Sequence, residues 1–205
     1  GRVKNASESL PIYYIAICMG LAKAFALLAM VVEKLINDLR RAAEIDGMTG
    51  LANRSSLIDR GEELLMQCRE EGNKFAVLFM DLDHFKAIND ELGHHAGDIA
   101  LNSFATIVKD IFDEEDNICG RYGGEEFVCL LTGDSAINVV QKSEMLRSRL
   151  AHKPIRIGGH PLTLTVSMGA ATDDGEFCLR RLITRADAAL YESKNSGRDR
   201  ITLAV

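Results

Sequence analysis

The chain opens with a long apolar stretch and then changes to shorter apolar runs. Residues 12–32 contain one charged residue, Lys23, and apolar side chains would fall on every side of a helix built from them. A helix of about 20 apolar residues can cross a bilayer. A central lysine costs roughly 2.5–3.5 kcal/mol on insertion scales, which the apolar surroundings can offset. We favour a membrane contact through residues 12–32, with a soluble helix as the alternative.

A second pattern overlays the apolar stretch and continues beyond it. Its apolar residues alternate spacings of four and three: Leu21, Phe25, Leu28, Val32, Leu35, Leu39 and Ala42. This is the a/d seam of a dimeric coiled coil, and Lys23 lies off it. The soluble alternative makes the segment a dimerising helix or the last helix of a sensor domain. Both interpretations predict a homodimer joined through a parallel helical stalk over residues 1–45.

From residue 46 onward, helical and strand patterns alternate. Helical spacing predicts helices over residues 55–70, 97–112, 135–150 and 177–193. Short apolar or alternating runs predict strands over residues 74–80, 118–121, 127–131, 162–170 and 201–203, with a hairpin at GGEE. Helices interleaved with hairpins indicate an α/β (α+β) sandwich with a mixed, mostly antiparallel central sheet flanked by helices. We therefore expect a second domain over residues 46–205.

Charge and cysteine content narrow the classes of function. The formal net charge is −6, whereas nucleic-acid-binding domains usually run basic, so we expect no nucleic-acid partner. A nucleotide that arrives with a divalent metal needs only local carboxylates and a few cations. The five cysteines form no CxxC pair and suit neither a zinc site nor a secreted disulfide framework. We expect them to be reduced and mostly buried.

Carboxylates gather at two places that are expected to be neighbours in the sheet. Asp81 and Asp83 close one predicted strand, and alternate residues of a strand share a face. Glu125 and Glu126 follow two glycines, which permit a ligand to approach the backbone closely. Alone, either pair is more often structural, as a helix cap or an exposed turn. Together they predict a two-metal nucleotide site, because magnesium prefers oxygen ligands and is bound by carboxylates with substrate phosphates.

Two cations lie at the end of the last predicted helix. Lys194 and Arg198 are four residues apart in SKNSGR, which places them on one face if the helix persists. Gly197 indicates that the helix is ending. The two cations could hold a triphosphate, or they could only complement the helix C-terminus, and the sequence leaves both alternatives open.

The motifs taken together resemble the GGDEF domain of diguanylate cyclases. They are DGMTGLANR at 46–54, FMDLDHFKAINDELGHHAGDIAL at 79–101, RYGGEEF at 121–127, LTLTVSMGAA at 162–171 and ADAALYESKNSGRDR at 186–200. The resemblance covers about residues 44–205 and implies a nucleotidyl-cyclase-like fold. It also implies that two GTP molecules are condensed into cyclic di-GMP and two pyrophosphates in bacterial second-messenger signalling. The family accepts either acid at the third position of the hairpin motif.

The resemblance implies how metal and catalysis are divided among the acids. Asp81 and Glu125 ligate magnesium, two ions per site with manganese as an alternative, and the Leu82 carbonyl assists. Glu125 or Glu126 also helps to deprotonate the attacking 3′-hydroxyl. Asp81, Glu125 and Glu126 are therefore the catalytic candidates.

The resemblance assigns the remaining candidates to the nucleotide. Asn89 and Asp98 read the guanine edge, because a carboxylate can accept from its N1–H and exocyclic amine and an amide can both donate and accept. Adenine lacks that donor pattern and should be rejected. The phosphates are contacted by Lys86, Lys194, Arg198 and backbone amides around His84 and Phe85, while Gly123 and Gly124 leave room for the nucleotide.

One feature common in the family is missing. Many relatives carry an RxxD product-binding site shortly before the hairpin, and here residues 114–117 read EEDN. Neither the arginine nor the aspartate is in place. We therefore predict weak or absent inhibition by cyclic di-GMP.

The resemblance also implies partners and location. Each subunit holds one GTP and half of the reaction, so activity requires a homodimer. The catalytic domain is expected in the cytoplasm, attached to the inner membrane if residues 12–32 cross it. The main alternative is a catalytically degenerate GGDEF domain that binds GTP or cyclic di-GMP as a signalling module, and a non-catalytic sensor fragment ranks below it. The chain begins without Met, and we expect it to be a fragment.

Overall fold

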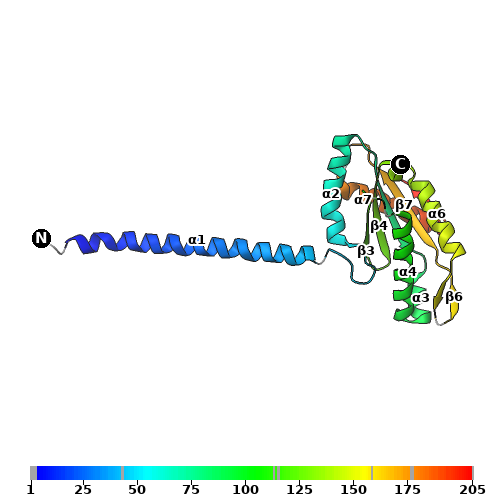
Figure 1. The fold of residues 1–205 in the computed structure, drawn as a ribbon, viewed down its shortest axis with the longest axis horizontal. Helices are drawn as coiled ribbons and strands as arrows, with labels where there is room; N and C mark the ends of the chain where they lie inside the picture. The colour runs from blue at the N-terminus through cyan, green and yellow to red at the C-terminus, as the bar shows by residue number, and fades with distance from the viewer. Residues whose placement is uncertain are drawn as a thin grey trace. The chain divides into compact units, whose positions relative to one another are not determined.

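The computed structural model describes residues 4–42, 44–112, 114, 116–157, 159–175 and 178–204. The chain divides into two compact units, Gly1–Ala43 and Glu44–Val205. The first is a single helix and the second is an α/β domain, and each is considered by itself (Figure 1).

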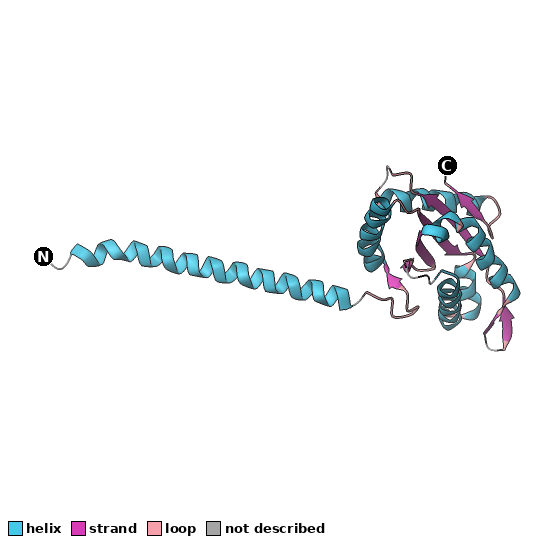
Figure 2. Cartoon of the chain, turned by 45° about the horizontal axis from the view of Figure 1, so that its top comes forward, coloured by secondary structure: helices cyan, strands magenta, loops and turns pink. Residues whose placement is uncertain are grey.

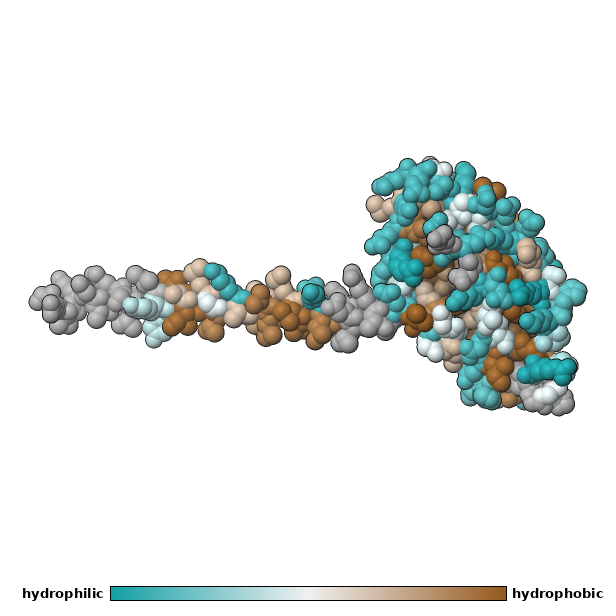
Figure 3. All heavy atoms as spheres, viewed as in Figure 1, coloured by the Kyte–Doolittle hydropathy of each residue, from teal (hydrophilic) through white to brown (hydrophobic). Residues whose placement is uncertain are grey.

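Helix α1, Lys4–Ala42, is one uninterrupted helix of 39 residues. Within the described residues, it is the one helix that could cross a membrane by length and composition, over Tyr13–Leu35. Apolar side chains cover much of its surface (Figure 3), and none of the spanning segment is buried. The seam predicted from Leu21 to Leu35 is exposed, while the side chains of Leu39 and Ala42 lie outside the described residues. The structure of the single chain therefore leaves the seam unpaired.

The second unit is built on a six-stranded sheet in the order β1-β3-β4-β2-β7-β8 within the described residues. The strands are β1 Ala52–Asn53, β2 Phe75–Leu82, β3 Ile118–Gly123, β4 Glu126–Thr132, β7 Val166–Thr172 and β8 Ile201–Leu203. The outer pairs β1–β3 and β7–β8 are parallel and the inner pairs are antiparallel. The predicted mixed, mostly antiparallel sheet is confirmed. A separate hairpin joins β5 Ile155–Ile157 to β6 His160–Leu162.

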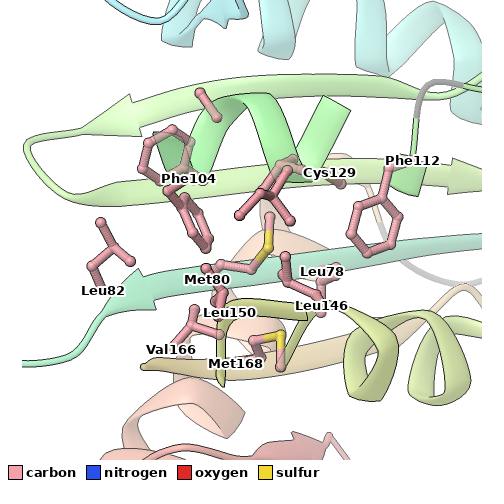
Figure 4. Close-up of a cluster of buried hydrophobic side chains, with 14 of the residues drawn as sticks. Leu78, Met80, Leu82, Phe104, Phe112, Cys129, Leu146, Leu150, Val166 and Met168 are labelled. Carbon is pink, nitrogen blue, oxygen red and sulfur yellow. The ribbon is translucent and has the colours of Figure 1, made fainter. Parts of the chain in front are cut away.

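Helices cover both faces of the sheet (Figure 2). They are α2 Arg54–Glu71, α3 Phe85–Leu92, α4 His94–Phe112, α5 Gly133–Ile137, α6 Val139–His152 and α7 Leu179–Asn195. Strand β2 is buried along its whole length, so its alternate side chains serve two cores. Leu78, Met80 and Leu82 pack with α4 and α6 (Figure 4), whereas Val77 and Phe79 pack with α2 and α7. The central strand is thus held from both sides, and its carboxyl end is a rigid base for polar side chains.

The structure differs from the predicted elements in three places. Phe85 and Lys86 begin helix α3, which was not predicted, and His84 with a left-handed φ of 57° starts this helix directly after β2. The helix predicted over residues 135–150 is two helices that meet at Asn138. The strand predicted over residues 162–170 is interrupted after Leu162 and resumes at Val166. Strands β1 and β5 were not predicted, since runs of two and three residues give no readable period.

Candidate active site

The hairpin between β3 and β4 brings its acids against the end of β2. Asp81 lies opposite Glu126 in the antiparallel β2–β4 pair. The Leu82 amide donates to the Glu125 carbonyl at 3.4 Å. Gly124 turns the chain with a φ of +26°, a conformation that suits glycine. The three candidate catalytic acids therefore meet at one edge of the sheet.

Burial and the neighbouring negative charges raise the pKa values of two of these acids. Burial raises the pKa of Asp81, with only partial compensation from Lys194, and Glu125 raises it further. Burial also raises the pKa of Glu126, and the Asp81 charge adds to this effect. A cation placed between the carboxylates would relieve both the desolvation and the repulsion. The charge distribution therefore fits a site for a divalent metal ion.

Lys194 supplies the positive charge nearest to this cluster. Its Nζ lies 2.7 Å from Asp81 Oδ2, and the Asp81 side chain is only 10% exposed while that of Lys194 is 32% exposed. Helix α7 carries Lys194 in its last turn, and the preceding Ser193 is fixed by donating its hydroxyl to the Met168 carbonyl at 2.7 Å. Lys194 is thus aimed at the acid end of β2 by a buried anchor.

Arg198 is placed differently from the helical interpretation. Helix α7 ends at Asn195, and Arg198 follows in a turn with a left-handed φ of 61°. Its backbone amide donates to the Ser193 carbonyl at 3.0 Å, and its side chain is exposed. Lys194 and Arg198 therefore do not share a helical face, although the turn returns Arg198 to the same end of α7.

Asp83 anchors the turn that carries Arg198. It is 5% exposed, accepts from the Ser167 hydroxyl at 2.6 Å and accepts from the Asp199 amide at 3.1 Å. Asp199 also has a left-handed φ, 46°, and its carboxylate is paired with Arg147 at 2.6 Å. Two consecutive strained residues are thus held from both sides. The hydrogen bonds of Asp83 serve the turn, while its charge adds to the raised pKa of Asp81.

The predicted base-reading residues meet between α3 and α4. A Cβ atom added to Gly97 would lie 2.1 Å from Asn89 Oδ1 and 3.1 Å from the tip of Phe85. The absence of a side chain at Gly97 therefore lets the Asn89 amide lie against α4, immediately beside Asp98. Asn89 and Asp98 are both half-buried, which leaves their polar groups accessible to a ligand.

The predicted phosphate donors lie where α3 begins. His84 is the N-cap, its side chain makes no capping hydrogen bond, and it is exposed like Lys86. The first amides of a helix have no intrahelical acceptor and favour anions. The start of α3 comes directly after Asp83, so its amides around Phe85 adjoin the acid end of β2.

The sequence analysis did not predict a set of polar interactions that stabilises the β3–β4 hairpin. The Arg121 guanidinium donates to the Gly124 carbonyl at 2.9 and 2.7 Å and lies 3.4 Å from Asp46. Asp46 accepts from the Thr49 amide and hydroxyl at 2.9 and 2.7 Å. Burial works to raise the pKa of Asp46, but the hydrogen bonds from Thr49 and the charge of Arg121 outweigh it and lower the pKa. In the sequence, Asp46 and Arg121 stand out only as single residues of the motifs DGMTGLANR and RYGGEEF.

The stretch at the missing RxxD site has other partners. Glu114 accepts from the Ser135 hydroxyl and is paired with Lys142. Asn117 donates to Ser135 at 3.0 Å and accepts from the Thr132 amide at 3.0 Å. Glu115 lies outside the described residues. Glu114 and Asn117 are therefore engaged in holding β4 and α5.

The support for a metal site comes from the chemistry of the donor atoms and not from side chains already arranged around a metal position. Within the described residues, no set of three or more His, Cys, Asp or Glu side chains is already arranged around a metal position. The carboxylates of Asp81 and Glu125 and the carbonyl of Leu82 are hard oxygen donors of the kind that magnesium prefers. Their convergence and the raised pKa of Asp81 make the set compatible with that ion.

We expect Glu126→Gln to stabilise the metal-free domain, by up to about 1 kcal/mol as for other partly exposed charges. Because the folded-state pKa of Glu126 is raised above its ordinary 4.5, the folded domain binds this proton more tightly than the unfolded chain. The wild type therefore loses stability as pH rises from 4.5 through the raised pKa. Urea unfolding in EDTA at pH 5 and 7.5 should show a larger gain for Glu126→Gln at the higher pH, while the exposed control Glu70→Gln shows none at either.

Comparison with known proteins finds a family match and relatives that cover most of this chain. The family described as "Diguanylate cyclase, GGDEF domain" matches residues 43–200. The diguanylate cyclase DgcP of Pseudomonas aeruginosa is 38% identical over 169 residues, which are 82% of this chain and 25% of DgcP. The cyclic di-GMP phosphodiesterase NbdA of the same organism is 36% identical over 166 residues, 79% of this chain and 21% of NbdA. The chain thus spans about a quarter or less of the length of these relatives.

A solved structure matches both units in order along the chain. The coiled coil and GGDEF domain of DgcB from Caulobacter crescentus, crystallised with cyclic di-GMP, is 30% identical with a TM-score of 0.75. The match covers 92% of this chain and all of that one. The family match, the sequence identities and the shared fold agree. The chain therefore belongs to the GGDEF domain family of diguanylate cyclases.

Proposed function

We propose that this chain condenses two GTP molecules into cyclic di-GMP and two pyrophosphates, acting as a homodimer with one half of the site on each subunit. The observation that carries the proposal is the meeting of Asp81, Glu126 and Lys194 at one end of β2. The relatives named diguanylate cyclases support it. A structural ion-pair network would not need three crowded acids beside Lys194.

Each element of the site contributes one part of the chemistry. Asn89 and Asp98 orient the guanine between α3 and α4, which sets the direction of the nucleotide. The amides at the start of α3, with Lys86, Lys194 and Arg198, hold the phosphates by charge and hydrogen bonds. Glu125 or Glu126 accepts the proton of the attacking 3′-hydroxyl. Positioning and electrostatic stabilisation supply most of the rate enhancement in phosphoryl transfer.

Asp81, Glu125 and the Leu82 carbonyl are the residues proposed to hold magnesium, with two ions per site and manganese as a substitute. When bound, the metal would neutralise charge on the α-phosphate and the departing pyrophosphate. Lys194 then has a second task. By pairing with Asp81 at 2.7 Å, it stabilises the carboxylate in the absence of the metal and is free to contact phosphate oxygens once that charge is neutralised.

Dimerisation is proposed through α1, and location follows from the same helix. The a/d seam from Leu21 to Leu35 is exposed in the single chain, and the similar DgcB structure comprises a coiled coil and a GGDEF domain. The apolar surface of Tyr13–Leu35 supports a membrane span, which would hold the catalytic domain at the cytoplasmic side of the inner membrane. In either case two parallel helices would bring two domains together.

The second candidate function is that of a degenerate domain that binds GTP or cyclic di-GMP without turnover. The similarity to NbdA, whose name is that of a phosphodiesterase, is the observation in its favour. Against it, the polar residues of the site are intact: Asp81, Asn89, Asp98, Glu125, Glu126, Lys194 and Arg198.

Incubation of the full chain in detergent with GTP and magnesium tests the proposal directly. We expect cyclic di-GMP and pyrophosphate in a molar ratio of one to two, detected by liquid chromatography and mass spectrometry. Binding of GTP with no product at any protein concentration would instead establish the degenerate alternative. A cyclic product from ATP under the same conditions would contradict the guanine assignment.

The Asp98→Ala variant is expected to lose discrimination at the guanine edge. GTP would lose acceptors for its N1–H and its exocyclic amine, whereas ITP has only the N1–H to lose. Because a hydrogen bond to a charged group is worth about 1.5–3 kcal/mol, the ratio of kcat/KM for GTP over ITP should fall at least roughly 10-fold. The exposed control Asp116→Ala should keep the wild-type ratio, and an unchanged ratio in Asp98→Ala would remove this residue from base recognition.

Added cyclic di-GMP is expected to leave the initial rate of GTP turnover nearly unchanged. The RxxD residues are absent, and Glu114 and Asn117 are held by Ser135 and Lys142. Initial rates measured against a cyclic di-GMP series test this expectation. Strong inhibition would reveal a product site built from other arginines.

A further inference from the structure

Two cysteines face each other at the base of the catalytic hairpin. Cys119 on β3 and Cys129 on β4 are directly paired in the antiparallel register, although ten residues separate them in sequence. The two Sγ atoms lie 2.6 Å apart. Both are free thiols. The pair therefore has its sulfur atoms nearly in bonding contact while still reduced.

The backbone at this position suits a covalent bond between the sulfurs. Residues directly opposite in an antiparallel pair have Cα atoms about 4.5–5.5 Å apart. Disulfides span Cα separations of about 4.4–6.8 Å. The strands are also held in register on both sides, since Ile118 pairs with Leu130 and Arg121 pairs with Phe127. A disulfide could thus form with little movement of the backbone.

The two thiols differ in their access to solvent. Cys129 is fully buried in the same core cluster as Phe112 (Figure 4), and burial raises the pKa of its thiol. Cys119 is half-buried and lines a pocket of about 250 Å³. Apolar side chains line much of the same pocket, together with the charged Glu44, Arg60 and Lys109, and a small neutral oxidant can reach Cys119 through it. Cys119 is therefore the thiol that reacts first.

We propose that Cys119 and Cys129 form a reversible disulfide across the base of the hairpin when the protein meets hydrogen peroxide. In the first step the Cys119 sulfur attacks one peroxide oxygen, the O–O bond breaks, and water leaves as the sulfur becomes a sulfenic acid. In the second step the Cys129 sulfur attacks that sulfur, the S–O bond breaks, and a second water leaves. The two thiols are oxidised by two electrons and one peroxide is reduced to two waters.

The remaining cysteines have different surroundings. Cys18 and Cys178 are exposed and Cys68 is buried, so the prediction of mostly buried thiols is wrong for all but Cys68 and Cys129. Cys68 packs in the core on the α2 and α7 side of the sheet, whereas Cys129 belongs to the opposite core. Only the Cys119–Cys129 pair, within the described residues, has its sulfurs in contact.

Peptide mapping of the full chain in detergent tests the proposal. The protein is treated with hydrogen peroxide, acid-quenched, unfolded in N-ethylmaleimide and digested with trypsin. Arg121 lies between the two cysteines, so trypsin separates the fragments 110–121 and 122–142, and only a disulfide keeps them together. We expect this linked pair, a monomer band for the cross-linked species without reductant, and three of the five cysteines labelled. Dithiothreitol should restore five labelled cysteines.

Matched variants separate this pair from general oxidation. Cys178→Ser should retain the link between fragments 110–121 and 122–142, whereas Cys119→Ser and Cys129→Ser should each lose it. Five labelled cysteines after peroxide would overturn the proposal. So would a sulfinic acid at Cys119 without a link, or a link that joins either residue to Cys18, Cys68 or Cys178. These readouts require no cyclase activity.

Discussion

Asp81→Asn is expected to lower the rate of cyclic di-GMP formation by at least about 10³-fold, since metal stabilisation of developing charge is worth several kcal/mol and each 1.36 kcal/mol is tenfold. Asparagine keeps the size of the side chain and an oxygen that can accept from Lys194. It removes the negative charge that the proposed metal needs. The variant also removes a buried charge, since burial raises the pKa of Asp81, and with it the Asp81 charge that adds to the effect of burial on the pKa of Glu126. Its loss of activity should therefore come without a loss of stability.

The measurement is the initial rate of product formation at saturating GTP, together with the urea midpoint in EDTA. Asp116→Asn is the matched control, because it removes an exposed carboxylate remote from the acid cluster. The control should keep the wild-type rate. If Asp81→Asn turned over GTP within tenfold of wild type, Asp81 could not be a metal ligand. Lower activity with a lower urea midpoint would show instead that Asp81 serves the fold.

Local pattern predicted the parts of the site that a short segment can encode. The β3–β4 hairpin was predicted because two glycines separate apolar runs. Asp81 and Glu125 were identified as candidate site residues because they lie where predicted strands end. Their meeting was predicted from the neighbouring order of the strands, which the β2–β4 pairing confirms. The outcome depended on the short length of the apolar run at β2 and on the DLD that ends it, because periodicity alone does not separate such a run from a buried helix.

Contacts between distant segments could not be predicted in the same way. Asp83 accepts from Asp199 across a sequence separation of 116 residues, and Arg121 reaches Asp46 across 75. No period or spacing relates such residues before the chain is folded. Helix α3 was missed for a related reason, because its start depends on the left-handed conformation of His84, which sequence pattern does not reveal for a histidine.

Leu28→Glu is expected to weaken self-association of the chain by at least about 10³-fold. Leu28 is a seam position of α1 and is 60% exposed in the single chain. Pairing of two helices would bury one such leucine on each, and losing a buried leucine costs about 2–5 kcal/mol. Two glutamates placed at the same level of the seam would also repel each other. Because the proposed reaction needs one GTP from each subunit, turnover should decrease as dimerisation is lost.

The neighbouring Leu27→Glu is a control that separates the two interpretations of α1. Leu27 is 66% exposed and lies off the seam, but it carries the same apolar surface within Tyr13–Leu35. A coiled coil predicts that Leu27→Glu keeps wild-type association and turnover while Leu28→Glu loses both, as measured by analytical ultracentrifugation and product formation over a protein dilution series. A membrane span with no seam predicts that both substitutions impair membrane insertion equally, at roughly 2.5–3.5 kcal/mol for a central acid. Equal behaviour of the two variants would therefore show that the helix, but not its a/d seam, brings the two catalytic domains together.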